Sequence, residues 1–155
     1  MIPGRMAFRG YMKLVTLNIL RGQPKHAYGL IKSLEDLVGM RPSTGVVYPV
    51  LRKSIQEGLV EVEMLRAEGR EVKVYKLSEK GLEYLKLHEG ELREALRLAE
   101  SFRKFRQAGC DRLLELVREL VKGAGRLSES ELIELRRAIA DFETRVLEIL
   151  ASSKV

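Results

Sequence analysis

The sequence predicts a mainly α-helical protein with a small β-hairpin wing. We expect a winged helix-turn-helix over residues 8–77, followed by C-terminal dimerisation helices over residues 78–151. Three observations predict this fold class. Three segments with helical apolar spacing come first, two short alternating segments around a Gly-containing loop follow, and the rest of the chain returns to helical spacing. Three helices and then a hairpin is the element order of a winged helix.

Glycines delimit the first two predicted helices. Apolar residues at helical spacing predict a helix over residues 8–22, which ends at Gly22. A second helix is predicted over residues 25–38 and ends at Gly39. Both segments alternate buried and exposed faces as helices around one core do.

The third predicted helix, residues 43–57, opens on a Pro-Ser start signal and carries an exposed aromatic and two cations. It also contains Pro49, whose ring clashes with the carbonyl of Gly45 four positions back. Because the missing hydrogen bond belongs to the first turns, we expect a short, slightly kinked helix.

Two strands follow this helix. Residues 59–65 and 72–77 both alternate apolar and polar side chains with period two. The loop between them, residues 66–71, contains a glycine and two arginines. The pattern predicts a β-hairpin that completes the winged helix.

The C-terminal half reads as helical. A long helix is predicted over residues 78–107, another over residues 110–122, and a last one after the capping box that Ser128 and Glu131 form. Apolar residues of the last helix recur with 3-4 spacing, which is typical either of an internal bundle core or of a subunit interface. With no other large domain to pack on, we favour an interface between two copies. The residues expected there are Leu92, Leu96, Phe102, Leu132, Leu135, Ile139, Phe142, Val146 and Ile149.

The excess of positive over negative charge lies in one half of the chain. Residues 1–77 carry the whole net charge of +6, because they contain 13 Lys and Arg against 7 Asp and Glu. Residues 78–155 contain 15 residues of each sign and have no net charge. Basic charge gathered in one module favours a polyanionic partner, although a merely solvated basic surface would look the same.

Several functional classes find no support in the sequence. The single cysteine, Cys110, excludes an intrachain disulfide framework and fits a reducing cytoplasm. Two distant histidines and one cysteine make no metal-ligand set, and we see neither a nucleophile–base arrangement nor a Gly-rich phosphate loop. We find no signal peptide and no apolar run long enough to cross a membrane. We therefore predict no cofactor, no membrane partner, no enzyme activity and a cytoplasmic location.

The basic half contains the candidate contacts to double-stranded DNA. The start of the third helix offers hydroxyls and free backbone N–H groups to a phosphate, and the loop arginines suit a minor groove. Each has a structural alternative: Ser43 as a helix cap, Tyr48 as a core residue, the wing charges as a guard against edge pairing, and His26 as a cap. The predicted DNA contacts are Lys25, Tyr28, Ser43, Thr44, Val47, Tyr48, Arg52, Lys53, Arg66, Arg70 and Lys73.

The same stretches resemble the PadR family of transcriptional regulators. The resemblance is carried by residues 19–30, 41–51, 57–60 and 74–81, and its most specific part is the Pro-Ser-x-Gly-x-x-Tyr-Pro-x-Leu pattern in the second stretch. The chain departs from the family pattern at residues 26–29, where it reads His-Ala-Tyr-Gly. It departs again at Ser54, where an apolar residue is expected and Ile55 follows instead.

The resemblance implies a homodimeric, repressor-like regulator with Ser43, Thr44, Tyr48 and the wing arginines facing DNA. Some family members release DNA on binding phenolic acids or flat hydrophobic drugs, so the resemblance leaves a small hydrophobic effector open. This chain has no tryptophan and few C-terminal aromatics, which does not support one. The competing hypothesis is a winged-helix interaction or assembly module that binds no specific DNA.

Overall fold

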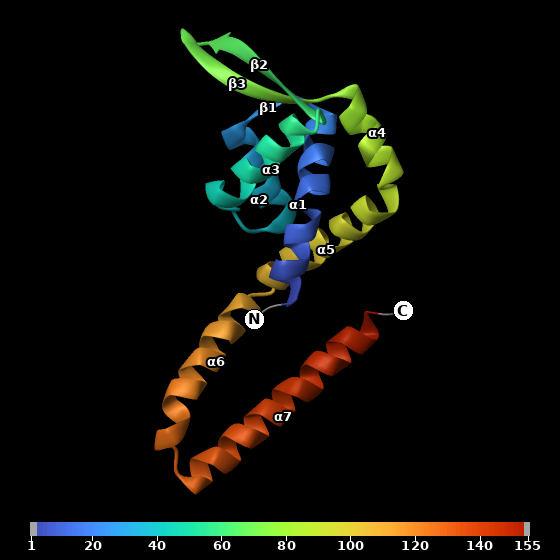
Figure 1. Cartoon of the computed structure of the whole chain (residues 1–155). Coiled ribbons are helices and arrows are strands. Elements are labelled where there is room, and N and C mark those ends of the chain that lie inside the picture. Colours follow the sequence, from blue (N-terminus) through green and yellow to red (C-terminus); the bar gives the residue numbers. More distant parts are fainter. Residues whose placement is uncertain (1–2, 154–155) are drawn as a thin grey trace. The chain divides into compact units, whose positions relative to one another are not determined.

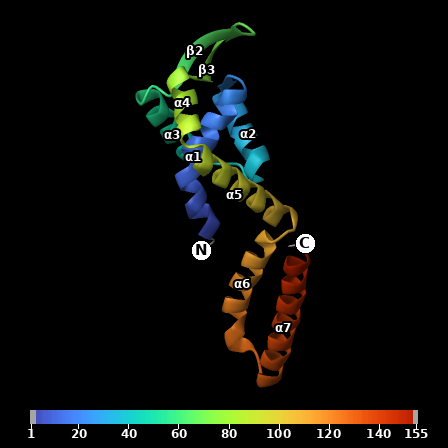
Figure 2. The same ribbon diagram turned by 90° about the vertical axis from the view of Figure 1, so that its right-hand side faces the viewer.

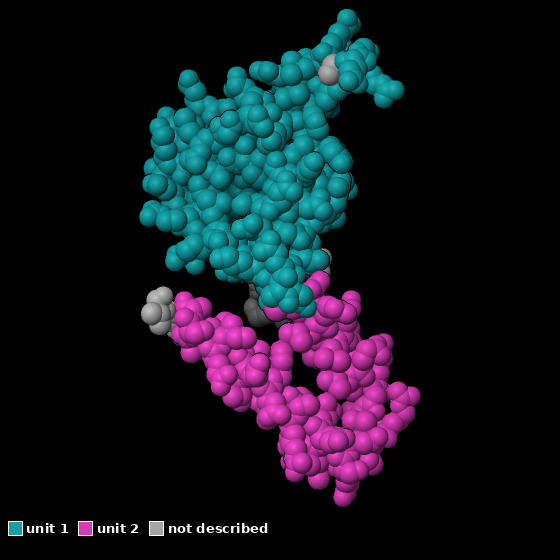
Figure 3. Space-filling view, turned by 180° about the vertical axis from the view of Figure 1, so that it is seen from behind, with its two compact units in different colours: residues 1–109 teal, residues 110–155 magenta. Residues whose placement is uncertain are grey.

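The computed structural model describes residues 3–153, with side-chain environments from Gly10 onward except at Ala67. The chain divides into two compact units, Met1–Gly109 and Cys110–Val155, coloured separately in Figure 3. In chain order the elements are α1 (Pro3–Gly22), β1 (Lys25–His26), α2 (Ala27–Val38), α3 (Thr44–Gln56), β2 (Val60–Ala67), β3 (Arg70–Leu77), α4 (Glu79–Leu87), α5 (Glu89–Gln107), α6 (Asp111–Gly123), the 3₁₀ turn η1 (Ala124–Arg126) and α7 (Glu129–Ser152).

The core of the first unit is built around α1. This helix contacts α2, α3, α4, α5 and β3, so it lies at the centre of the unit (Figure 1). Its residues Val15 and Leu17 are completely buried, as are Leu30 and Leu34 of α2. The mostly helical architecture with a small antiparallel sheet confirms the predicted fold class.

The sheet has three antiparallel strands in the order β1-β3-β2. The hairpin of β2 and β3 extends beyond the helices (Figures 1 and 2). Its two-residue turn has positive φ at both central residues, 52° at Glu68 and 76° at Gly69, as a type I′ turn requires. The strands are therefore longer and the loop shorter than the sequence predicts.

The second helix begins two residues later than predicted. Lys25 and His26 form the short strand β1, paired with Tyr75 and Val74 of β3. His26 is the N-cap of α2, and its Nδ1 accepts a hydrogen bond of 2.9 Å from the Gly29 N–H. The alternative interpretation of His26 as a cap is thus confirmed.

The single helix predicted over residues 78–107 is wrong. It is two helices, α4 and α5, separated at His88, whose backbone N–H and Nδ1 both lie within hydrogen-bond distance of the Tyr84 carbonyl. Ser78 caps α4 through the Gly81 N–H and donates to the Gly58 carbonyl, which ties the helix to the turn after α3. The break lets α5 pack along α1.

The second unit is a pair of helices, α6 and α7, joined by η1 (Figure 1). The predicted capping box is present, with Ser128 and Glu131 each bonding the other's backbone N–H. None of the described residues of α6 or α7 is buried. The two helices diverge from their connection, and Figure 3 shows open space between them.

The boundary between the two compact units differs from the predicted domain boundary, which follows Leu77. The compact units divide between Gly109 and Cys110, because α4 and α5 pack on the helices of the first unit. Over the residues searched, no helix has the length and apolar character to span a membrane.

Candidate nucleic-acid interface

Helix α3 presents one face to the core and one to solvent. Val47, Leu51 and Ser54 are at most 1% exposed, and they lie on the inner face. The outer face is formed by side chains spaced three to four residues apart, all of them exposed. These are Thr44, Gly45, Tyr48, Pro49, Arg52, Lys53 and Gln56.

This division corrects one predicted DNA contact. Val47 has no exposed surface, because it belongs to the core cluster that α3 forms with α1 and the sheet. Tyr48 is 44% exposed, so its ring is partly covered and partly open to solvent. Burial of Tyr75 on β3, with a smaller electrostatic contribution from Tyr48, raises the pKa of Tyr75.

The buried serine of α3 is a second departure from expectation. An apolar residue is expected at position 54, where the chain has Ser54 followed by Ile55. In the structure Ser54 stays in the core and Ile55 is 36% exposed, because a shift of one position turns a helical side chain by about 100°. The Ser54 hydroxyl has no hydrogen-bond partner among the described residues.

The amino end of α3 is open to an anion. Ser43 occupies the N-cap position, but its side chain makes no capping hydrogen bond. The Ser43 carbonyl accepts from the N–H groups of Val46 and Val47, whereas the preceding amides of Thr44 and Gly45 belong to the first turn and have no intrahelical acceptor. Hydroxyls and amides at a helix amino end are suited to phosphate oxygens.

A stack of three side chains lies directly before α3. The guanidinium of Arg41 lies 5.2 Å from the ring centroid of Tyr28, and the His26 ring is stacked 6.2 Å from the same tyrosine. Arg41 also pairs with Glu35 at 3.5 Å. Tyr28 remains 60% exposed, so the stack holds an aromatic ring and a cation in fixed positions at the protein surface.

Arg41 was not among the predicted DNA contacts. It could have been predicted, because an arginine immediately before a Pro-Ser helix start lies next to the exposed amino end of that helix. Lys25 was predicted near a helix amino end, and it lies in strand β1, opposite Tyr75 and one residue before the N-cap of α2. Its side chain is half-buried, so the sheet rather than α2 sets its position.

The wing is less basic than its arginines suggest. Arg66 lies opposite Glu71 across the hairpin, and Lys76 pairs with Glu63 at 3.8 Å. Four basic side chains of the hairpin are thus matched by four acidic ones. They are Arg66, Arg70, Lys73 and Lys76 against Glu61, Glu63, Glu68 and Glu71. All eight are exposed.

The carboxyl end of α3 is fastened to the neighbouring helices. Lys13 of α1 forms an ion pair with Glu57, and the Lys80 ammonium donates to the Glu57 carbonyl at 2.8 Å. The hydrogen bond from Lys13 lowers the pKa of Glu57 below its ordinary value. Lys13 also lies 4.5 Å from the ring centroid of Tyr84, so one lysine joins α1, α3 and α4. These contacts hold the carboxyl end of α3 against α1 and α4.

Comparison with known proteins identifies this arrangement. Residues 16–87, which include α2, α3 and the wing, match the model of the transcriptional regulator PadR-like family. Residues 16–87 belong to the PadR-like family. The relatives of the PadR-like region are transcriptional regulators and not enzymes.

A curated relative supports the assignment. Over 102 residues, 64% of this chain, the sequence is 34% identical to the transcriptional regulator YqjI of Escherichia coli K12. The match covers 46% of that protein, so the chain spans about half the length of the curated relatives it matches. The likeness therefore concerns the PadR-like region and not the whole relative.

Solved structures share the fold. A proposed transcriptional regulator of Thermoplasma acidophilum is 27% identical, with a TM-score of 0.53 over 62% of this chain and 93% of the solved one. A PadR family transcriptional regulator of Eggerthella lenta is 25% identical, with a TM-score of 0.51 over 72% of this chain and 86% of the solved one.

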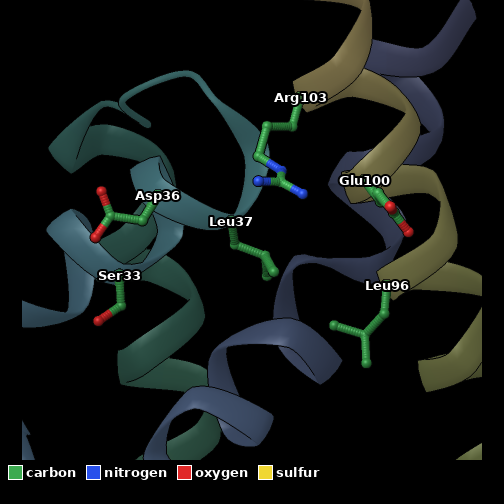
Figure 4. A pocket seen from close by; sticks show the side chains of 6 residues that line it. All are labelled: Ser33, Asp36, Leu37, Leu96, Glu100 and Arg103. Carbon is green, nitrogen blue, oxygen red and sulfur yellow. The ribbon is translucent and has the colours of Figure 1, made fainter.

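The PadR-like unit has a shallow groove between α2 and α5, of about 540 Å³ (Figure 4). Leu37 and Leu96 are its apolar lining residues, and the side chains of Ser33, Asp36, Glu100 and Arg103 surround them. An effector site is typically enclosed and mostly apolar. This groove gives no support to a small hydrophobic effector.

The predicted interface residues fall into two sets. Leu92 is 5% exposed in the core of the first unit, so it does not face a partner, and this expectation is corrected. Leu96 and Phe102 are half-buried against the same core. In the set on α7, Leu135 and Val146 are half-buried and the others are exposed, with Ile139 51%, Phe142 50% and Ile149 66% exposed.

Proposed function

We propose that this protein is a homodimeric, sequence-specific DNA-binding transcriptional regulator that represses by occluding a promoter. The observation that carries the proposal is the outer face of α3, which is exposed along its length and follows an N-cap serine whose side chain makes no capping hydrogen bond. Membership of residues 16–87 in a family of transcriptional regulators supports it. In the proposed complex α3 lies in the major groove.

Phosphate contacts would supply most of the affinity. The candidates are the stack of Tyr28 and Arg41, which precede α3 in the chain, the amino end of α3, and Lys53 in the last turn of that helix. Neutralising phosphates releases counterions, so the affinity should fall steeply with salt. The wing, with its balanced charge, would contribute less to this term than α3 and its flanks.

The second unit would join two copies. The 3-4 seam of α7 is solvent-exposed in the single chain, and nothing among the described residues of α6 or α7 is buried. Pairing with a second copy would remove that apolar surface from water. Two α3 helices would then reach half-sites about one helical turn apart on a pseudo-palindromic operator.

Selection of bound duplexes from a random DNA pool at near-physiological salt tests the proposal. An enriched inverted repeat is the expected result. Retention of DNA without any enriched sequence would instead indicate an architectural binder. No retention, at low salt as well, would contradict DNA binding.

Replacing Arg52 with alanine tests the placement of α3. Loss of a base-edge or phosphate contact should weaken binding to the enriched duplex about tenfold. The control is Arg93→Ala, which removes the same charge from an exposed position of α5. If the Arg52→Ala and Arg93→Ala variants bound the enriched duplex with equal affinity, Arg52 on the outer face of α3 would not contact the DNA.

One observation favours a second candidate, an interaction or assembly module. On strand β2 the apolar side chains Val62, Met64 and Leu65 are 40%, 53% and 49% exposed, at a sheet edge with balanced charge. This surface suits a protein better than it suits a polyanion. Persistence of a protein complex in the absence of DNA binding would favour this candidate.

A further inference from the structure

The outer face of α3 carries two residues that disfavour helices. Gly45 and Pro49 are both exposed, and they lie one turn apart on the same face. Glycine costs backbone entropy in a helix, and proline removes a backbone donor. Such residues persist in a helix when something other than helix stability requires them.

Nothing inside the protein requires a glycine at position 45. A Cβ added there would meet only the Ser43 Oγ, at 3.9 Å, and Gly45 is not among the residues with positive φ. Two other glycines behave differently. Gly39 has a φ of 74°, and a Cβ on Gly81 would lie 2.2 Å from the Leu59 carbonyl oxygen. The fold demands those two glycines and does not demand Gly45.

An open glycine is not in itself a site. Gly90, in the first turn of α5, also has nothing within 4 Å of an added Cβ. Gly45 differs because Pro49 follows it at the position that should donate to its carbonyl. An α-helical carbonyl accepts from the N–H four residues on, and Pro49 has none. The Gly45 carbonyl is thus left without its helical donor, on a residue that is itself exposed.

This pair presents two chemical features to the outside. The Gly45 carbonyl is an acceptor for which the exocyclic amino group of adenine or cytosine is the matching donor in a major groove. The ring of Pro49 is a compact apolar surface that fits the methyl group of a thymine. The absent Cβ allows the helix backbone to come close enough for both contacts.

We propose that Gly45 and Pro49 form a base-reading step of this protein. The backbone of α3 lies against the base edges, the Gly45 carbonyl accepts from an exocyclic amino group, and the Pro49 ring contacts the 5-methyl group of a neighbouring thymine. The inference rests on the proposed function and adds two specificity-determining residues to it. Tyr48 and Arg52 flank the step on the same face of α3.

The test compares three full-length proteins: wild type, Gly45→Ala and Gly90→Ala. Each is measured on the duplex that the wild type enriches and on an unrelated duplex of equal length. We expect Gly45→Ala to bind the enriched duplex at least tenfold more weakly and to lose its preference for that duplex over the unrelated one. Both alanine variants should keep or raise the thermal midpoint, since both additions enter open space, and Gly90→Ala should bind as the wild type does. Wild-type affinity and preference in Gly45→Ala would overturn the inference.

Thymine-to-deoxyuridine replacement tests the role of Pro49. Removing the methyl group at one half-site position should weaken wild-type binding several-fold, and the same replacement should leave Pro49→Ala unaffected. An equal loss in both proteins would overturn the Pro49 contact. If the wild type enriches no sequence, the proposed function fails and this inference fails with it. An enriched wild type with an unchanged Gly45→Ala profile overturns this inference alone.

Discussion

The two units are built from similar helical sequence, yet they treat their apolar side chains in opposite ways. In the first unit Leu17, Leu30 and Leu34 are completely buried among helices that cross at α1. In the second unit Val121 is 75% and Ile149 66% exposed. The difference teaches that amphipathic helices form a core only when enough faces meet, and two helices in a hairpin do not supply them.

This contrast has a thermodynamic consequence. The first unit buries a contiguous core and should unfold cooperatively as a single chain. The second unit has 46 residues by its bounds, Cys110–Val155, and small units rarely reach stability without a partner or a staple. Its stability should therefore depend on protein concentration, whereas that of the first unit should not.

The largest effect on the free energy of unfolding should come from removing a buried side chain from the core of the first unit. Leu34→Ala removes a completely buried side chain, and the lost transfer energy and the cavity together should cost about 2–5 kcal/mol. Chemical denaturation of the first unit checks this, and the loss should be the same at all protein concentrations. A loss that shrinks at high protein concentration would show that the first unit also depends on association.

Next in size is the change at the seam of α7. Ile139→Arg places a charge where the proposed dimer buries an apolar side chain, and we expect at least a hundredfold weaker self-association, about 2.7 kcal/mol. Sedimentation measures this, and denaturation of the first unit should not change. Arg137→Ala, at an exposed position of the same helix, serves as the control. A monomeric wild type would contradict the contrast between the units.

A smaller effect, of opposite sign, is expected inside α3. Ser54→Ala should stabilise the first unit by about 1 kcal/mol, because the buried hydroxyl has no partner among the described residues. Denaturation measures it. Ser101→Ala is the matched control, since that exposed hydroxyl donates to the Arg97 carbonyl at 3.0 Å. A destabilised Ser54→Ala would mean that the hydroxyl does find a partner in solution.

The smallest effect concerns the start of α7. Ser128→Ala removes the capping box and should lower the stability of that helix by about 1 kcal/mol, measured as helicity. Hydrogen bonds from the Ser128 backbone and side chain lower the pKa of Glu131 below its ordinary value of 4.5. A lowered carboxyl pKa contributes stability above its unfolded value, and that contribution is lost as pH falls through the folded pKa. The difference between wild type and variant should accordingly narrow below about pH 4.5 and stay constant above it.

Local signals in the chain predicted many of these features. Glycine and proline positions gave the ends of the first three helices to within a few residues, and the capping box gave the start of α7. The break at His88 was not predicted, because residues 78–107 contain no proline, and Gly90, two residues after the break, weakens a helix without necessarily ending it. The bend exists because α5 packs on α1 through Leu92, Ala95 and Ala99.

The candidate site shows the same division. Periodicity placed the exposed cations of α3 correctly at the surface. The same periodicity also indicates that Val47 faces inward, because it lies four residues before Leu51, so this contact could have been excluded from the sequence. Periodicity could not show that acidic residues oppose the wing arginines, since cross-strand partners depend on the turn that sets the register. The stack of His26, Tyr28 and Arg41 joins residues from two elements and was not visible in the linear pattern.

The sequence by itself determined the helices, the hairpin, the caps and the uneven charge, because these depend on contacts within a few residues along the chain. The tertiary structure decided where α4 ends and α5 begins, and which apolar side chains lie in the core and which remain on the surface of α6 and α7. Those outcomes depend on the number of helical faces that meet in space. A local pattern specifies that a face is apolar, and only the packing of distant segments decides whether it is covered.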